Sequence, residues 1–119
     1  MLVVEDEHDI ATFLRAYFRA SGTDVAHLDP TSPDEVADAV EAHAPTCVLL
    51  DLNLRGFNGL DAYRAIRDRG MATPVIVVTA DPNPATHRTA LREGVAAIVH
   101  KPFSAKELYA LVAAHTHGR

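Results

Sequence analysis

The sequence predicts an α/β fold built around one doubly wound parallel sheet. Strand-like apolar runs alternate five times with segments whose apolar residues recur at helical spacing. Alternation of this kind is typical of βαβ units, whose right-handed crossovers leave the strands parallel. The central run is apolar throughout, as expected for a strand covered by helices on both faces.

The first apolar run covers residues 2–4. Residues 8–20 follow as an amphipathic helix, which Gly22 is placed to end in a left-handed conformation. We expect the buried face of this helix to contain Ile10, Phe13, Leu14, Tyr17 and Phe18. Residues 25–28 form a weaker and more polar strand pattern, which suits the edge of a sheet.

Capping signals define the start of the second helix. Ser32 is a suitable N-cap, Pro33 follows at the first helical position, and Glu35 completes a capping box. We expect the inner face of this helix to contain Val36, Ala39, Val40 and His43. Pro45 ends the helix, and residues 47–50 form the central strand.

The second half of the chain continues the alternation. Asn58 is expected to cap a third helix that ends at Gly70, and residues 75–78 form the fourth strand. Residues 81–84 form a loop, because each of its two prolines disfavours helix at the residue before it. The remaining elements are a short helix up to Glu93, a strand over residues 97–99 and a last helix that begins with a capping box over residues 104–107.

The order of the strands follows from their polarity. With the more polar second strand at one edge, the common solution is 2-1-3-4-5, the flavodoxin-like arrangement. We find no linker, repeat or low-complexity tract, so we expect residues 1–119 to form one domain.

Composition and charge exclude several classes of protein. The formal net charge is −5 without a run of Lys and Arg, so we expect no direct binding of nucleic acid by this domain. Cys47 is the single cysteine and lies inside an apolar run, which fits a reducing compartment. We see no signal-peptide pattern and no apolar segment of bilayer length, so we expect a cytoplasmic protein without a membrane partner.

Residues suited to phosphate or metal chemistry close four of the apolar runs. Glu5 and Asp6 follow the first run, Asp51 the third, Thr79 the fourth and Lys101 the fifth. Open α/β sheets bind ligands outside the carboxyl ends of their strands. We therefore expect these side chains to gather at one edge of the sheet.

The carboxylates of Glu5, Asp6 and Asp51 predict a cation site. Two bare carboxylates about 4 Å apart repel by roughly 4 kcal/mol at an effective dielectric near 20. Such a cluster favours Mg²⁺ or, alternatively, Mn²⁺, with the backbone carbonyl of Asn53 as a further candidate ligand. The competing interpretations are solvated acids at strand ends and simple turn chemistry at Asn53.

Asp51 differs from the other carboxylates because it directly follows the apolar residues of a rigid strand. A carboxylate in this position can attack phosphorus and form an aspartyl phosphate. The hydroxyl of Thr79 can donate to a phosphoryl oxygen, and the ammonium of Lys101 can neutralise phosphoryl charge. Taken singly, each residue has an ordinary structural explanation, so it is their ordered combination that predicts phosphoryl transfer.

This combination resembles the receiver domain of two-component response regulators over essentially the whole chain. The matching stretches are residues 2–7, 49–54 with Gly59, 77–80 and 94–103. The resemblance implies a regulatory domain, not an enzyme, that is phosphorylated by a histidine kinase or phosphotransfer protein and slowly dephosphorylates itself. It would act through an output domain or a target protein.

The resemblance also assigns roles to the strand-end residues. Asp51 would be the phosphoacceptor, and Thr79 and Lys101 would bind the phosphoryl oxygens. Mg²⁺ would be held by Asp6, Asp51 and the Asn53 carbonyl, with Glu5 reaching it directly or through water. The peptide bond between Lys101 and Pro102 would be cis.

Two residues depart from the family pattern. Arg55 stands where the family usually has proline, so the loop after Asp51 loses a fixed φ and gains a cation. Ile98 stands where the family typically has an aromatic residue or histidine that reorients on phosphorylation. We expect this β-branched side chain to couple the site more weakly to the surface formed by the fourth helix, the fifth strand and the fifth helix.

Two other functions compete with a phosphorylation switch. A degenerate receiver could serve as a constitutive protein-binding module, although the acceptor residues are complete. A phosphatase resembling the haloacid dehalogenases also uses a strand-end Asp, Mg²⁺, Thr and Lys. That family needs an acid two residues after the nucleophile, where this chain has Asn53, and places the nucleophile on the first strand.

Overall fold

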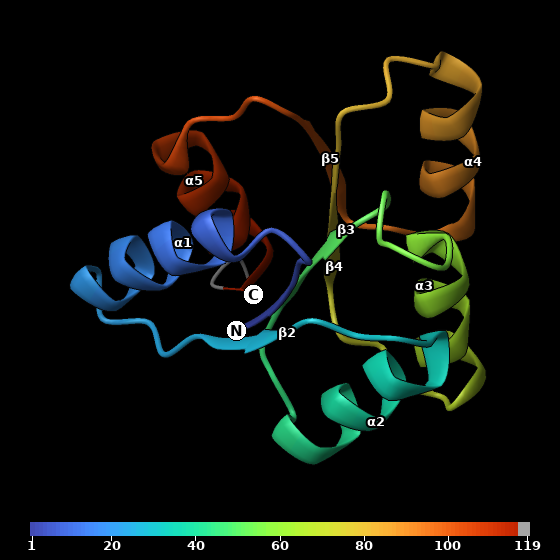
Figure 1. The fold of residues 1–119 in the computed structure, drawn as a ribbon, viewed down its shortest axis with the longest axis horizontal. Coiled ribbons are helices and arrows are strands. Elements are labelled where there is room, and N and C mark those ends of the chain that lie inside the picture. The colour runs from blue at the N-terminus through green and yellow to red at the C-terminus, as the bar shows by residue number, and fades with distance from the viewer. Residues whose placement is uncertain (117–119) are drawn as a thin grey trace.

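The computed structural model describes residues 1–116, in which five strands alternate with five helices (Figure 1). The strands are β1 (Leu2–Val4), β2 (Ala26–Leu28), β3 (Val48–Asp51), β4 (Val75–Thr79) and β5 (Ala97–His100). The helices are α1 (His8–Ala20), α2 (Pro33–His43), α3 (Gly59–Asp68), α4 (Pro84–Glu93) and α5 (Ala105–Thr116). Residues 117–119, which the expected domain includes, lie outside the described residues.

The strands form one parallel sheet in the order β2-β1-β3-β4-β5. This confirms the predicted flavodoxin-like topology. β3 and β4 are buried at every position, whereas the three residues of the edge strand β2 are all partly exposed. The polarity of residues 25–28 therefore identified the edge correctly.

Helices cover both faces of the sheet (Figure 1). α1 and α5 pack on one face, in a core that includes Val3, Leu49 and Ile76 from the strands. α2, α3 and α4 pack on the other face, where alternate strand residues such as Val4 and Leu50 point. The half-buried Ile98 belongs to this second side.

The predicted capping residues start their helices as expected. Ser32 Oγ accepts a hydrogen bond from Glu35 N (3.2 Å), and Ser104 Oγ accepts one from Glu107 N (3.1 Å). Asn58 Oδ1 accepts one from Leu60 N (2.8 Å). The capping box at the start of α2 is modified, because the Glu35 carboxylate accepts from Thr31 instead of from the Ser32 backbone.

The structure corrects three local predictions. Phe13 is 54% exposed, because the buried stripe of α1 follows Ala11, Leu14 and Phe18 and leaves Phe13 beside it. His43 is exposed, since it lies one turn beyond the last buried residue of α2. Pro84 is the first residue of α4 and not part of the preceding loop, a position that tolerates proline because its N–H would be unpaired in any case.

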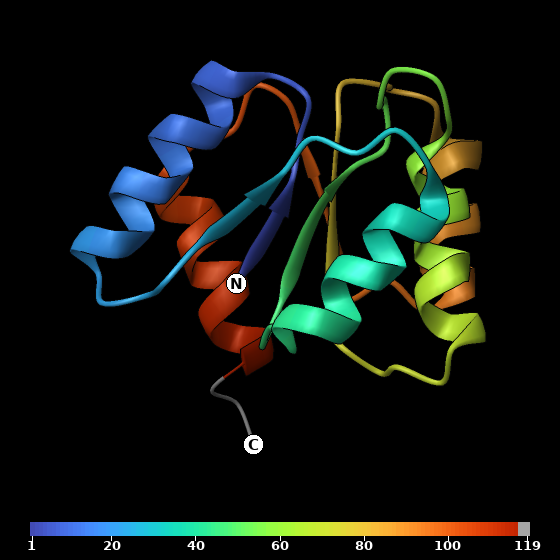
Figure 2. The ribbon, with the colours of Figure 1, turned by 60° about the horizontal axis from the view of Figure 1, so that its bottom comes forward.

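All five strands run toward one edge of the sheet, and the loops that follow β1, β3, β4 and β5 gather there (Figure 2). We refer to it as the carboxyl edge. The predicted site residues all lie at or directly after these strand ends. Among residues 1–116, the helices are too short or too polar to cross a bilayer.

Candidate functional site

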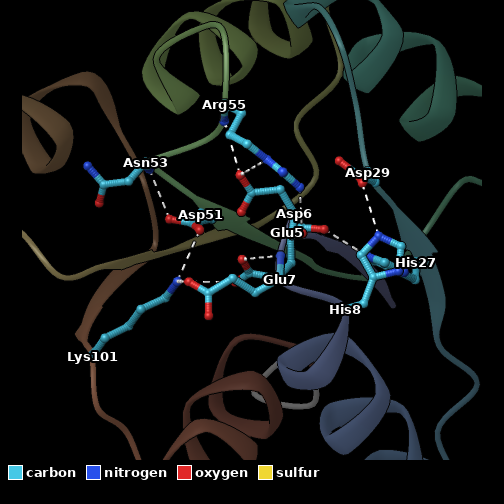
Figure 3. Close-up of polar contacts among 10 residues, drawn as sticks. All are labelled: Glu5, Asp6, Glu7, His8, His27, Asp29, Asp51, Asn53, Arg55 and Lys101. Carbon is cyan, nitrogen blue, oxygen red and sulfur yellow. Dashed lines mark hydrogen bonds and ion pairs between the residues drawn. The ribbon is translucent and has the colours of Figure 1, made fainter.

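Strand pairing brings the predicted acids together at the carboxyl edge. β1 lies beside β3, with Val4 opposite Leu50, so the residues that follow each of them are neighbours. Oxygen atoms of Glu5, Asp6 and Asp51 all lie within 4.8 Å of one another (Figure 3). Glu5 and Asp51 are 3% and 2% exposed, and the Asp6 side chain is 10% exposed.

The electrostatics of Glu5 indicate an excess of negative charge in this cluster. Burial, a hydrogen bond with Asp51 and the charge of Asp51 raise the pKa of Glu5 from 4.5 to about 8. A hydrogen bond from Glu7 N (3.1 Å) and the charge of Lys101 oppose this change without cancelling it. The cluster therefore favours either protonation of Glu5 or a further cation beside it.

Lys101 is the partly buried cation of the site. Its Nζ lies 3.0 Å from Asp51 Oδ2, 3.3 Å from Glu5 Oε2 and 3.6 Å from Glu7 Oε1. Burial acts to lower the pKa of Lys101, but the surrounding carboxylates outweigh it and the pKa is raised. The peptide bond between Lys101 and Pro102 is cis, as the sequence resemblance implied.

Thr79 and Asn53 lie beside Asp51. Thr79 is fully buried, and its hydroxyl donates to Asn53 Oδ1 (3.1 Å) while accepting from Asp81 N (3.0 Å). Asn53 N donates to Asp51 Oδ1 (2.9 Å). The Asn53 side chain thus contacts Thr79. The backbone N–H of Asn53 fixes the orientation of the Asp51 carboxylate.

Gly59 allows the loop after Asp51 to fold back against the strand. A Cβ atom at this position would lie 2.3 Å from the backbone oxygen of Asp51 and 2.8 Å from Leu52 Cα. Both contacts are with backbone, so neither can be relieved by a side-chain rotation. Spacing from Asp51 does not reveal this contact, because it depends on how the loop closes.

Arg55 contacts the same acidic cluster from its outer side. The backbone N–H and the guanidinium Nε of Arg55 both donate to Asp6 Oδ2, at 3.1 and 3.2 Å. Arg55 Nη2 donates to the Asp6 carbonyl oxygen at 3.2 Å. The sequence indicated an additional cation in this loop but gave no signal for its partner.

Comparison with known proteins identifies the family. The family model of the response regulator receiver domain matches residues 1–113. The chain belongs to the response regulator receiver domains. Its fold is shared by the receiver domain of NtrX from Brucella abortus, at a TM-score of 0.86 and 27% identity over 99% of this chain and 98% of that one. The signal receiver domain of a LuxO repressor protein from Vibrio parahaemolyticus gives a TM-score of 0.90 at 26% identity, over 98% and 88% of the two chains.

Longer relatives match this chain over part of their length. The DNA-binding response regulator MtrA of Mycolicibacterium smegmatis is 37% identical over 115 residues, which are 96% of this chain and 49% of the relative. The transcriptional regulatory protein PhoP of Bacillus subtilis, named for alkaline phosphatase synthesis, is 29% identical over 96% of this chain and 47% of its own. The receiver sequence thus spans about half the length of these relatives.

These relatives correct one prediction about partners. The net charge predicts no direct binding of nucleic acid by this domain, whereas several relatives are named DNA-binding response regulators. The exclusion of nucleic acid as a partner is therefore wrong, because it does not hold for these longer relatives. The charge of 119 residues describes the receiver alone and carries no information about the other half of the relatives' length.

Proposed function

We propose that this receiver is a signalling switch that accepts a phosphoryl group on Asp51 from a histidine kinase or phosphotransfer protein. The orientation of the Asp51 carboxylate is the observation that carries the proposal. One oxygen accepts from Asn53 N at 2.9 Å, and the other lies 3.0 Å from Lys101 Nζ. A carboxylate held between a backbone donor and an ammonium is positioned to act as a nucleophile.

In the proposed transfer, an Asp51 oxygen forms a bond to phosphorus while the bond from phosphorus to the donor's imidazole nitrogen breaks. The nitrogen keeps the electron pair of that bond. Lys101 neutralises charge on the phosphoryl oxygens. Thr79 exchanges its present acceptor, Asn53 Oδ1, for a phosphoryl oxygen. Slow hydrolysis of the acyl phosphate then returns the domain to its unphosphorylated state. The reaction thus serves regulation and not the turnover of a substrate.

The acidic cluster fits a hard divalent cation. Glu5, Asp6 and Asp51 present oxygen ligands within 4.8 Å of one another, and the raised pKa of Glu5 marks a deficit of positive charge. We propose that these residues, with the Asn53 carbonyl, hold Mg²⁺, and that Mn²⁺ substitutes for it. When bound, such an ion offsets phosphoryl charge and orients oxygen ligands.

We further propose that the phosphorylated receiver regulates an output domain, and in this case a DNA-binding one. The support is that this receiver spans about half of relatives named DNA-binding response regulators. The receiver would be one unit over residues 1–119, and a cytoplasmic location agrees with the buried free thiol of Cys47. The phosphatase alternative is not favoured, since Asn53 stands where the required acid would be.

Phosphorylation by a small donor tests the central proposal. Acetyl phosphate with Mg²⁺ should add one phosphoryl group, detectable by intact-protein mass spectrometry and labile to hydroxylamine as acyl phosphates are. Asp51→Asn should abolish the added mass. Asp61→Asn, which alters an exposed acid of α3, should leave it unchanged. Labelling that persists in Asp51→Asn would overturn the assignment.

A further inference from the structure

Arg55 makes an unusual number of contacts with one acid of the cluster. Three of its N–H donors reach Asp6, two of them at the same carboxylate oxygen, Oδ2 (Figure 3). The Asp6 side chain is 10% exposed, whereas that of Arg55 is 77% exposed. The arginine therefore approaches a mostly buried acid from solvent.

These contacts occupy the acceptor capacity of Asp6 Oδ2. The backbone N–H and the Nε–H of Arg55 take up both lone-pair directions of this oxygen. Coordination of a cation through this oxygen requires that at least one of the two donors leaves, whereas coordination through Asp6 Oδ1 is opposed by the charge of the guanidinium. The guanidinium is also permanently charged, so it repels any second cation at the same carboxylate.

Lys101 does not have this effect on Asp6. Its ammonium lies within 4.0 Å of Glu5, Glu7 and Asp51, which are the other carboxylates of the site. Asp6 is therefore the acid whose charge is offset by Arg55, and Arg55 is its ion-pair partner among the described residues.

We propose that Arg55 is a tethered counter-cation that competes with the divalent ion for Asp6 and so lowers the ion affinity of this receiver. The inference rests on the proposed metal site. Ion binding displaces the guanidinium into solvent, a movement that its high exposure permits at low cost. The backbone N–H of Arg55 can remain with Asp6, so the loop need not rearrange.

Calorimetric titration with Mn²⁺ tests the proposal on the full chain at low ionic strength. Arg55→Gln keeps the backbone donor and removes the charge, and we expect it to bind Mn²⁺ on the order of tenfold more tightly. Arg55→Lys should stay close to wild type. Arg69→Gln is the matched control, because it removes an equal charge from an arginine paired with Asp38 on α2.

A second readout follows the side chain itself. The ¹⁵Nε resonance of Arg55 should move on addition of Mg²⁺ in the wild type, as the guanidinium leaves Asp6. Equal or weaker Mn²⁺ affinity in Arg55→Gln would overturn the competition while leaving the metal site in place. Absence of binding to wild type and Arg55→Gln alike would overturn both the inference and the metal site on which it rests.

Discussion

Two glutamates of this receiver each contact a cation, yet their pKa values change in opposite directions. Glu93 forms a two-pronged pair with Arg64, at 2.8 Å from Nε and 2.6 Å from Nη2, and its pKa is lowered. Glu5 lies 3.3 Å from Lys101 Nζ, and its pKa is raised to about 8. A short distance to a cation therefore does not by itself determine which protonation state is favoured.

The two glutamates differ in their exposure to solvent and in the number of carboxylates that share their cation. Glu93 is near the surface beside an arginine whose other contact is Asp61, so little desolvation opposes the pair. Glu5 is buried, and its lysine also serves Asp51 and Glu7. The single positive charge of Lys101 cannot offset the negative charges of two buried carboxylates and one exposed carboxylate. The excess negative charge favours a further cation at the site.

The pH dependence of stability should show this contrast most strongly at Glu5. A pKa raised from 4.5 to about 8 in the folded state contributes stability below pH 4.5 that is lost as the pH rises through 8. The loss should be several kcal/mol, since each unit by which the pKa is raised corresponds to about 1.4 kcal/mol. In urea unfolding with a chelator, Glu5→Gln should remove this decline, so the variant gains on wild type between pH 5 and 9. A parallel decline in both proteins would place the proton elsewhere.

Divalent ions should restore the stability that is lost at high pH through the excess negative charge around Glu5. Under the proposed metal site, Mg²⁺ at one hundred times its dissociation constant should raise the free energy of unfolding by about 2.7 kcal/mol. The gain should appear as a higher melting temperature at pH 8 and vanish with chelator. Asp6→Asn should lose the response and Glu93→Gln should keep it. An unchanged shift in Asp6→Asn would place the ion at another site.

Removal of the shared lysine should have a somewhat smaller effect. Lys101→Met leaves Glu5 and Asp51 buried without their cation. We expect a loss of about 2 kcal/mol at pH 8, less than for a fully buried pair because the Lys101 side chain is 15% exposed. The loss should shrink toward pH 5, where protonated Glu5 no longer needs a counter-charge. Chemical denaturation checks both values, with the exposed Lys106→Met as the control. A pH-independent loss would mean that Lys101 acts through packing.

The exposed pair should give the smallest effect and the opposite pH dependence. Glu93→Gln should cost under about 1 kcal/mol, since solvent screens the pair with Arg64. A lowered pKa contributes stability above the unfolded value of 4.5, which is lost as the pH falls through the folded value. Thermal unfolding of this variant and wild type should therefore converge on acidification. A larger difference at low pH would contradict this account.

Sequence patterns predicted the fold because each strand and helix carries its own local signal. The alternation of periodicities, the caps at Ser32 and Asn58 and the polar edge strand were sufficient for the topology. The meeting of Glu5 with Asp51 also followed, since neighbouring parallel strands end side by side. The roles of these residues and of the metal remain predictions.

Features that depend on side-chain paths could not be predicted in this way. Arg55 has several rotatable bonds, so its contact with Asp6 depends on the closed loop and not on spacing. His87 and His100 lie on separate elements without a common spacing, yet their Nε2 atoms are 3.2 Å apart. Phe13 fits the apolar pattern of α1 but lies outside its buried stripe. The periodicity of apolar residues gives the direction of the buried face and not how much of the helix surface the sheet and α5 cover.

The close approach of Gly59 to Asp51 offers a way to change the geometry of the site without changing its charge. Alanine at position 59 adds one methyl group and no polar atom, and that group would overlap the backbone of Asp51 itself. The displacement would reach Asp51, the proposed phosphoacceptor, through the main chain, although every ionisable residue would remain in the sequence. Gly59→Ala thus changes the geometry of the site without changing its charge. The variant can distinguish what the shape of the site contributes to its function from what its charges contribute.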